Sequence, residues 1–453
     1  MQKKVIIIGG GLAGLSAACL AVQHGYRVDL YDDNSSLGGD SRSTTVQGFQ
    51  FDRHPKLFPA PYLLDPLIKS ASSSTPISSQ FQTVSPATQL LFADGKRMQF
   101  VAEQDARNSA QESGILTLKA ESAFQKLDNV LQEIIERSSG RKKNLWQKII
   151  PTRSMNLLQP LAPFLQQLST DPYLQQSLLT LSALTGTPIP DLQVRDLFLP
   201  ALIRKSGLFF PIQGWDAIIN RLQDYLVEAG VKFFLQTKVL DIFPPQKNIV
   251  GIRLADQSQQ WADEILNTTN SLVPEEMRFS TTQPMIIFHL GLKNGSGLET
   301  FSYHNIIMIN GNLKTWNSNK NFSPAWLPDY LYVYHSTSEN PKHVPEGRGL
   351  ISLKIPLPST PIQMREKEML RLNVLNLLER SYLPGLKQNI EMESTEIIDP
   401  VNSHHKINPN NPAPFLTPGT SRVIHLHQYY GNRRPSIPAM LFAVQRWIES
   451  TRS

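Results

Sequence analysis

Cysteine and long apolar runs are the features that this chain of 453 residues has least of. It contains a single cysteine, Cys19, so no disulfide can form within the chain, and the composition fits a reducing compartment. Cys19 lies in an apolar stretch, where we expect a small core residue and not a nucleophile. No uninterrupted apolar stretch approaches the roughly 18–20 residues needed to span a bilayer. Any membrane association would therefore be peripheral.

Strong charge is also missing. The formal net charge is +6, and we find neither a basic-aromatic array nor zinc-ligand spacing, which argues against a nucleic-acid partner and a metal site. The first apolar strand begins almost at Met1, so we expect no secretory signal. These observations favour a cytoplasmic protein. The modest positive charge leaves open a peripheral contact with the anionic inner face of the cell membrane.

What is present is a glycine-rich turn between a strand and a helix. Val5 to Ile8 is an unbroken β-branched run that suits a buried parallel strand. Gly9 to Gly14 then fits the pattern G-x-G-x-x-G, in which Gly9 permits the tight turn, Gly11 lets a pyrophosphate approach the backbone, and Gly14 lets the helix pack against the strand. The N–H groups that open the helix, around Leu12 and Ala13, attract the anion. The sequence therefore predicts a dinucleotide site.

An acid at the end of the next strand supports this prediction. Arg27 to Tyr31 reads as a second strand, and Asp32 follows it at the distance where a carboxylate accepts hydrogen bonds from an adenosine ribose. Gly25 is expected to end the intervening helix. A second pair of glycines, Gly38 and Gly39, comes soon after the acid. A second glycine turn at this place resembles the start of glutathione-reductase-like flavoproteins, and this resemblance favours FAD over NAD as the tightly held ligand.

The rest of the chain alternates between helical and strand patterns. Helices are expected between about Asp105 and Leu181, after Gly214, between Met364 and Leu383, and between Pro438 and Ser450. A hairpin with Asp94 and Gly95 at its turn, and several later strands, predict a largely antiparallel second sheet. The expected strands span Val231–Leu235, Val239–Ile242, Met285–Leu292, Asn305–Ile309, Tyr330–Ser336, Leu350–Pro358 and Arg422–Leu426. The last of these is expected to return to the first domain.

The order of these motifs resembles a known family. The chain is similar to bacterial phytoene-desaturase-type carotenoid oxidoreductases, within the flavin amine oxidase superfamily. The resemblance spans nearly the whole length. Beyond the glycine turn and Asp32, it rests on "LGG" at 37–39, "GFQFD" at 48–52, "LFADGKRM" at 91–98, "FFPIQGWDAI" at 209–218, "NTTN" at 267–270, "YHNI" at 303–306, the segment 331–358 and "IPAMLFAV" at 437–444.

The resemblance implies an α/β fold with three parts. A glutathione-reductase-like Rossmann FAD domain, discontinuous in sequence, would comprise residues 1–69, 207–280 and 415–453. A substrate domain built on a mixed or antiparallel sheet would comprise 70–104 and 281–414. A helical subdomain would comprise 105–206. Within the last part, Gly140 to Pro151 carries basic residues around Trp146 and Ile149, which indicates either a membrane-docking patch or a solvated helix face.

The resemblance also implies the residues that would contact FAD. These are Gly9, Gly11, Leu12, Ala13, Gly14, Asp32, Gly39, Arg42, Val239, Pro438 and Met440. The chain departs from the family in three places, one of which is "DRHP" at 52–55, where the family usually has a glycine and this chain has Arg53 and His54. Asp40 replaces the basic residue that often follows the second glycine pair, so Arg42 would have to take over the phosphate contact. The C-terminal flavin segment has few glycines, and Arg433 is a candidate for compensating charge.

Three functions fit these observations. The first is an FAD-dependent oxidoreductase that acts on C–C bonds of a hydrophobic polyene or isoprenoid, such as a carotenoid precursor, by desaturation or related redox or isomerisation. The second is an FAD enzyme of the same fold with another hydrophobic substrate, such as an amine or a polyketide. The third is a relative that has lost flavin and serves as a binding partner. No catalytic residue is assigned, because a flavin carries this chemistry; His304 is expected to be a sheet histidine with satisfied hydrogen bonds.

Overall fold

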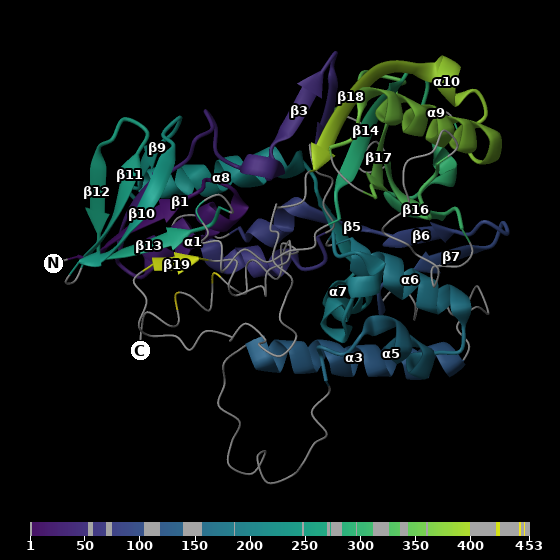
Figure 1. Cartoon of the computed structure of the whole chain (residues 1–453), viewed down its shortest axis with the longest axis horizontal. Coiled ribbons are helices and arrows are strands. Elements are labelled where there is room, and N and C mark those ends of the chain that lie inside the picture. The colour runs from purple at the N-terminus through teal and green to yellow at the C-terminus, as the bar shows by residue number, and fades with distance from the viewer. Residues whose placement is uncertain are drawn as a thin grey trace, which may run out of the picture.

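The computed structural model describes residues 2–52, 58–68, 75–103, 118–138, 156–184, 186–246, 249–269, 272, 283–295, 297–310, 326–335, 343–358, 361–398, 423–425, 444 and 448. Two bodies of sheet dominate the molecule, with a group of helices below the second one (Figure 1). The first contains the glycine turn. The second contains the later strands. Among the residues that the structure describes, no helix is both long enough and apolar enough to cross a bilayer.

A parallel sheet forms the centre of the first body. Five of the described strands lie side by side in the order β19 (Val423–His425), β13 (Glu264–Asn267), β1 (Lys4–Ile8), β2 (Arg27–Tyr31) and β9 (Lys232–Phe234). All four strand pairs are parallel. The β-branched run at Val5 to Ile8 is buried on both faces of this sheet, as a strand with neighbours on both sides requires. β19 joins it from the far end of the sequence, as predicted.

Different layers cover the two faces of this sheet. On one face lie α1 (Leu12–Gln23) and the amphipathic α8 (Gly214–Glu228), with Trp215, Ile218 and Leu222 in the shared core. Val444 and Ile448, the two described residues of the predicted closing helix, are helical and pack into the same core. On the other face lies an antiparallel sheet of β10 (Val239–Gln246), β11 (Ile249–Leu254) and β12 (Gln259–Ala262).

Seven of the described strands form the second sheet. Their order is β18 (Ile390–Ile398), β14 (Met285–Leu292), β17 (Gly349–Pro356), β16 (Tyr330–His335), β15 (His304–Met308), β6 (Thr88–Leu91) and β7 (Arg97–Phe100). Every pair is antiparallel except β15 with β6. The predicted hairpin at Asp94 and Gly95 is therefore part of this sheet, whereas β18 was not anticipated from the sequence.

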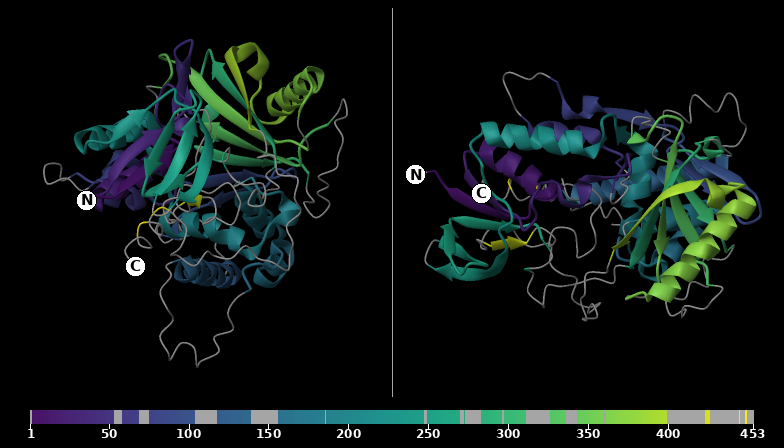
Figure 2. Two further views of the ribbon diagram at one scale, coloured as in Figure 1. Left: turned by 60° about the vertical axis from the view of Figure 1, so that its left-hand side comes forward. Right: turned by 90° about the horizontal axis from the view of Figure 1, so that it is seen from above.

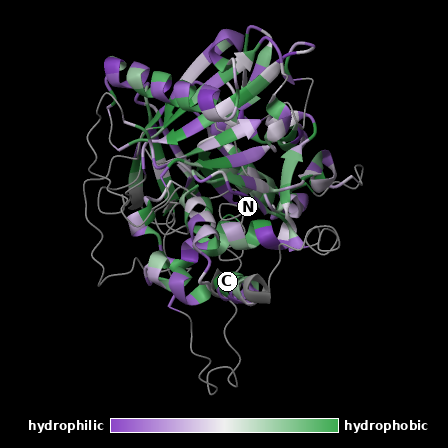
Figure 3. Ribbon diagram, turned by 90° about the vertical axis from the view of Figure 1, so that its right-hand side faces the viewer, coloured by the Kyte–Doolittle hydropathy of each residue, from purple (hydrophilic) through white to green (hydrophobic). Residues whose placement is uncertain are grey.

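Helices cover both faces of the second sheet (Figure 2). α9 (Met364–Ser381) lies on the outer face, where Leu370, Val374 and Leu378 pack against the strands. Hydrophilic and hydrophobic residues alternate along this helix, while the strands beneath are largely hydrophobic (Figure 3). A short helix, α10 (Leu386–Asn389), follows it.

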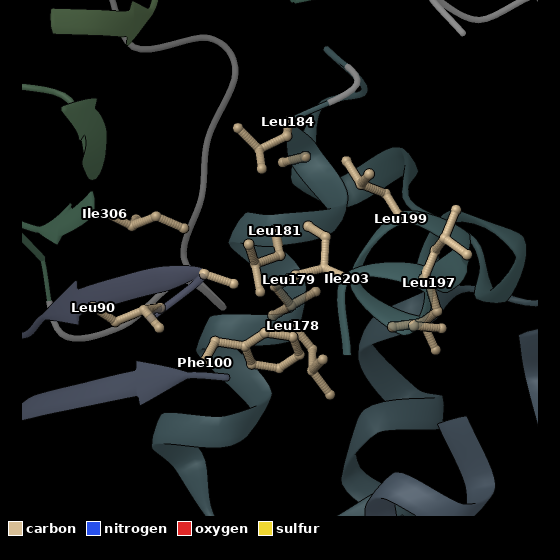
Figure 4. Packing of buried hydrophobic residues seen from close by; sticks show 14 of the residues in the cluster. Leu90, Phe100, Leu178, Leu179, Leu181, Leu184, Leu197, Leu199, Ile203 and Ile306 are labelled. Carbon is tan, nitrogen blue, oxygen red and sulfur yellow. The ribbon is translucent and has the colours of Figure 1, made fainter. Parts of the chain in front are cut away.

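The opposite face packs on the helices α3 (Leu118–Ser138), α5 (Leu161–Leu168), α6 (Pro172–Ala183) and α7 (Phe198–Ser206). Leu90, Phe100 and Ile306 of the sheet meet Leu181 and Ile203 of the helices in one continuous core (Figure 4).

Two short antiparallel pairs link these bodies. β3 (Ser43–Val46) pairs with β4 (Phe49–Asp52) directly after the second glycine pair. β5 (Phe81–Val84) pairs with β8 (Leu208–Pro211), so residues placed in different predicted domains share one ladder. The α/β composition, the parallel sheet and the mostly antiparallel second sheet agree with the fold class predicted from the sequence.

Candidate functional site

The carboxyl ends of the parallel strands converge on the glycine turn. Ligands of open α/β sheets bind at this edge. β1 runs directly into Gly9, whose N–H donates to the carbonyl oxygen of Tyr31 at 2.8 Å. On the other side, Thr268 at the end of β13 donates through its backbone N–H and its hydroxyl to the carbonyl oxygen of Ile8, both at 2.9 Å. The turn is therefore held between the neighbouring strand ends.

The three glycines of the motif have three different surroundings. Gly9 has a φ of +103°, which a side chain rarely permits. A methyl group on Gly14 would lie 1.8 Å from the carbonyl oxygen of Gly9, so helix and turn could not approach as they do. A methyl group on Gly11 would meet no atom within 4 Å. Gly11 therefore fits the role of the backbone position that faces a ligand.

The N-terminus of α1 is open to an anion. Gly11 is the N-cap residue, no side chain caps the helix, and its first turn contains no acidic residue. The first N–H groups of a helix have no partner within the helix itself, and together with the helix dipole they attract negative charge. Leu12, Ala13 and Gly14 supply such groups here. The helix is mostly Ala, Leu and Val, and its Cys19 is completely buried, which raises the pKa of the thiol.

Asp32 lies at the edge of the glycine turn and stabilises it through hydrogen bonds. One carboxylate oxygen, Oδ2, accepts a short hydrogen bond from the N–H of Gly10, and the other, Oδ1, accepts from the backbone and side-chain N–H groups of Asn34, both at 2.8 Å. Asp32 is 8% exposed. The ribose role that the sequence predicts for Asp32 stays a prediction. The structural role was not predicted, although the position of the acid opposite the first glycines is a signal that could have revealed it.

The second glycine pair lies against the first. The N–H of Gly38 donates to the carbonyl oxygen of Gly10 at 2.8 Å, and Gly38 and Gly11 form a parallel bridge. A methyl group on Gly39 would lie 3.4 Å from the Cα of Gly11. Gly39 also has a φ of +52° and opens a short turn that contains Asp40. The two glycine turns predicted to hold one ligand are therefore adjacent.

Val239 is the first residue of β10, the strand that follows β9. The residues just before Val239 contact the backbone of Asp32 and Asn34. The N–H of Thr237 donates to the carbonyl oxygen of Asp32 at 2.9 Å, and the N–H of Gln236 donates to that of Asn34 at 3.0 Å. The side chain of Val239 is buried in the core beneath the parallel sheet. Only its backbone is therefore available as a ligand contact.

Arg42 follows the second glycine turn and is held by neighbouring groups. Its Nε donates to the carbonyl oxygen of Leu37 at 2.5 Å, and its Nη1 donates to Asn220 Oδ1 at 2.8 Å and lies 3.4 Å from Asp216 Oδ1. Asp216 and Asn220 belong to α8. The guanidinium thus joins the turn to that helix, an arrangement that the sequence did not anticipate because the partners are about 175 residues away.

We expect Arg42→Ala to lower thermal stability and FAD affinity together, because the hydrogen bond to Leu37 fixes the carbonyl just before the glycine pair. Asp216→Ala is the matched control: it removes the ion pair and the hydrogen bond that Asp216 Oδ1 accepts from the N–H of Ser43, and it leaves the contacts of Arg42 with Leu37 and Asn220. This partly exposed pair is worth at most about 1 kcal/mol. Thermal melts and flavin titration of both variants check this. Weaker FAD binding by Arg42→Ala at unchanged stability would instead indicate a direct phosphate contact.

Several predicted positions lie outside the described residues. They include Pro438, Met440 and Arg433 of the C-terminal segment, together with the basic stretch from Gly140 to Pro151. Within the part of the chain that the structure describes, no three His, Cys, Asp or Glu residues are grouped so as to hold a metal ion.

His304 differs from its expectation as a satisfied sheet histidine. It is fully buried, and its Nδ1 lies 2.9 Å from the hydroxyl of Thr88. Its Nε2 is also buried but has no hydrogen-bond partner. Burial, with a smaller effect from the positive charge of Lys354, lowers the pKa of His304 to about 3, so the imidazole is neutral.

Comparison with known proteins places this geometry among dinucleotide-binding folds. Residues 7–66 match the model of an NAD(P)-binding Rossmann-like domain. A 4,4'-diaponeurosporene oxygenase of Staphylococcus aureus is 22% identical over 442 residues, covering 90% of this chain and 87% of its own length. The similarity to carotenoid oxidoreductases that the motifs indicated is thus found again, over 90% of the chain.

Solved structures show the same fold over the whole chain. A putrescine oxidase bound to putrescine has a TM-score of 0.65 at 12% identity and covers 100% of both chains. An oxidoreductase from Methanosarcina mazei has a TM-score of 0.62 at 16% identity, over 98% of this chain and 100% of its own. A Rab GDI from Plasmodium falciparum has a TM-score of 0.51 at 14% identity, over 87% of this chain and 88% of its own. Its name is not that of an oxidoreductase. The predicted fold class is confirmed.

Proposed function

We propose that this protein is an FAD-dependent oxidoreductase that acts on C–C bonds of a hydrophobic polyene or isoprenoid, by desaturation or a related redox or isomerisation step. The observation that carries the proposal is the uncapped N-terminus of α1 beside Gly11, at the carboxyl edge of the parallel sheet. Similarity over nearly the full length to a protein named 4,4'-diaponeurosporene oxygenase supports the substrate class.

The surroundings of the turn fit a pyrophosphate. Gly11 has open space where a side chain would stand, and α1 offers N–H groups without a competing acid in its first turn. Gly39 follows the second turn against Gly11, so backbone from two segments can surround one anion. Asp32 would accept hydrogen bonds from the ribose while keeping Gly10 in place. Val239, Pro438 and Met440 are proposed to contact the remaining parts of FAD through backbone groups.

The protein's own residues contribute to the reaction by binding FAD and substrate and by keeping water away from them. Bound flavin supplies the oxidising capacity for removing hydrogen from an allylic C–H group. We assign the orientation of a long apolar substrate to the domain of the second sheet, as the family resemblance implies. The face of this sheet towards α6 and α7 carries Tyr330, Tyr332 and Tyr334, all at most 1% exposed. Burial raises the pKa values of these tyrosines, so they stay neutral in the core that they share with the helices.

The absorption spectrum of the purified protein tests the cofactor. We expect flavin bands between about 370 and 450 nm, and release of FAD on denaturation. NAD in place of flavin would overturn the cofactor assignment. Failure to bind flavin at any concentration would favour the alternative of a non-enzymatic binding partner. Reduction of bound flavin under anaerobic conditions by a partly saturated polyene, and not by an amine, would separate the first enzyme hypothesis from the second.

We also propose peripheral membrane contact through the basic stretch from Gly140 to Pro151. Lys142, Lys143 and Lys148 would face lipid phosphates, each contributing about 1 kcal/mol near an anionic surface. Charge reversal of the three lysines to glutamate is expected to abolish flotation with anionic liposomes and leave the flavin spectrum unchanged. Equal flotation of wild type and variant would exclude this stretch as the contact.

A further inference from the structure

Asp32, the proposed ribose acceptor, has little hydrogen-bonding capacity left. A carboxylate offers about four lone-pair sites, two on each oxygen. Oδ1 accepts from the backbone N–H and the side-chain Nδ2 of Asn34, both at 2.8 Å, and Oδ2 accepts from the N–H of Gly10. Three of about four sites are therefore in use. Unless one of these bonds is given up, the carboxylate can accept from only one further hydroxyl group.

The side chain of Asn34 offers a second acceptor beside this carboxylate. Its Nδ2 donates to Asp32 Oδ1 at 2.8 Å and to Asp33 Oδ1 at 3.2 Å. The amide nitrogen therefore faces the two carboxylates, and the amide oxygen is directed away from them. Among the described residues, no group donates to Asn34 Oδ1, and the residue is exposed. A ribose carries two neighbouring hydroxyl groups, so it needs two acceptors of this kind.

The backbone around Asn34 is held from two sides. Its N–H donates to Asp32 Oδ1, and its carbonyl oxygen accepts from the N–H of Gln236 at 3.0 Å. Gln236 has a φ of +52°, which is uncommon for a residue with a side chain, and Thr237 after it donates to the carbonyl oxygen of Asp32 at 2.9 Å. The amide of Asn34 thus extends from a fixed backbone, and a group positioned in advance costs less to order when a ligand binds.

We propose that Asn34 Oδ1 accepts one of the two hydroxyl groups of the adenosine ribose of FAD, and that Asp32 Oδ2 accepts the other. The carboxylate lies between Gly10 and Asn34, so an adenosine that extends from a pyrophosphate at Gly11 past Asp32 would next meet this amide. Asn34 is then a specificity-determining residue that favours dinucleotides with an intact ribose. This inference rests on the proposed function and adds a cofactor contact to it.

The test is calorimetric titration of protein freed of flavin with three ligands: FAD, FAD whose adenosine lacks the 2′-hydroxyl, and FAD whose adenosine lacks the 3′-hydroxyl. We expect wild-type protein to bind both deoxy ligands about fivefold more weakly than FAD, as the loss of one hydrogen bond implies. Asn34→Ala should bind FAD about fivefold more weakly and bind one deoxy ligand as well as it binds FAD. Ser35→Ala, at the next exposed residue, is the matched control and should behave as wild type.

The outcomes separate the role of Asn34 from the proposed function. If wild-type protein discriminates against only one deoxy ligand, or Asn34→Ala still discriminates against both, Asn34 does not bind the ribose and the proposed function stands. Tighter binding of FAD by Asn34→Ala also overturns the role, since the amide would then only occupy Asp32. If FAD does not bind to wild-type protein, the proposed function itself fails. Should circular dichroism show that Asn34→Ala is misfolded, the comparison of the three ligands on wild-type protein still decides.

Discussion

Gly14→Ala is expected to abolish FAD binding and to destabilise the protein by more than about 3 kcal/mol, the range of severe backbone and packing clashes. The added methyl group would lie 1.8 Å from the carbonyl oxygen of Gly9, and backbone cannot move aside as a flexible side chain can. The helix would have to withdraw from the strand, which also removes its N–H groups from the anion. Thermal denaturation and flavin titration measure the two losses.

Gly11→Ala is the matched variant, with a contrasting result. Nothing lies within 4 Å of the added methyl group, and the φ of −67° suits any residue. We expect the melting temperature without FAD to stay within about 2 °C of wild type, while FAD affinity falls at least about tenfold, because the methyl group would occupy the path of the pyrophosphate. Normal FAD binding by Gly11→Ala would show that the ligand does not pass this position. Wild-type stability of Gly14→Ala would contradict the packing argument.

Asp32→Ala is expected to weaken FAD binding and the empty protein together. The contacts with Gly10 and Asn34 are hydrogen bonds to a carboxylate, as the proposed ribose contacts would be, and each is worth about 1.5–3 kcal/mol. Losing the hydrogen bonds within the protein also leaves the N–H of Gly10 without its acceptor. Both the melting temperature without FAD and the dissociation constant for FAD should therefore change.

Asp33→Ala, at the exposed neighbouring acid, is the control for Asp32→Ala and should change neither quantity. A variant of Asp32 that loses flavin at unchanged stability would indicate that the carboxylate serves the ligand alone. A variant that loses stability and keeps its affinity would remove the ribose from the proposal.

Local sequence patterns predicted the strands and the helix around the glycine turn, because each of these elements is determined by residues close together in the sequence. The β-branched run before Gly9, the spacing to Asp32 and the glycine at the end of α1 all act over short distances in the sequence. The amphipathic spacing of Ile218, Ile219, Leu222 and Leu226 likewise gave α8 its buried face. The family resemblance added the discontinuous order, including the return of β19 to the first sheet.

Long-range contacts were beyond the reach of sequence reasoning. The link from Arg42 to Asp216 and Asn220, and the unpaired Nε2 of His304, depend on which distant segments meet. β18 alternates polar and apolar residues weakly, since most of its side chains are only partly buried, and gave no clear strand pattern. The predicted contact residues Pro438 and Met440 lie outside the described residues, so their roles stay predictions.

The order of strands in the parallel sheet has a consequence for synthesis of the chain. β1 pairs with β13 about 260 residues later, and β13 pairs with β19 about 160 residues later still. Such distant pairings make folding slow, since loops must close before contacts form. Until the last segment leaves the ribosome, one side of β13 presents unpaired backbone groups, a state prone to association between chains. Nascent chains of this protein are therefore expected to depend on chaperones until translation is almost finished.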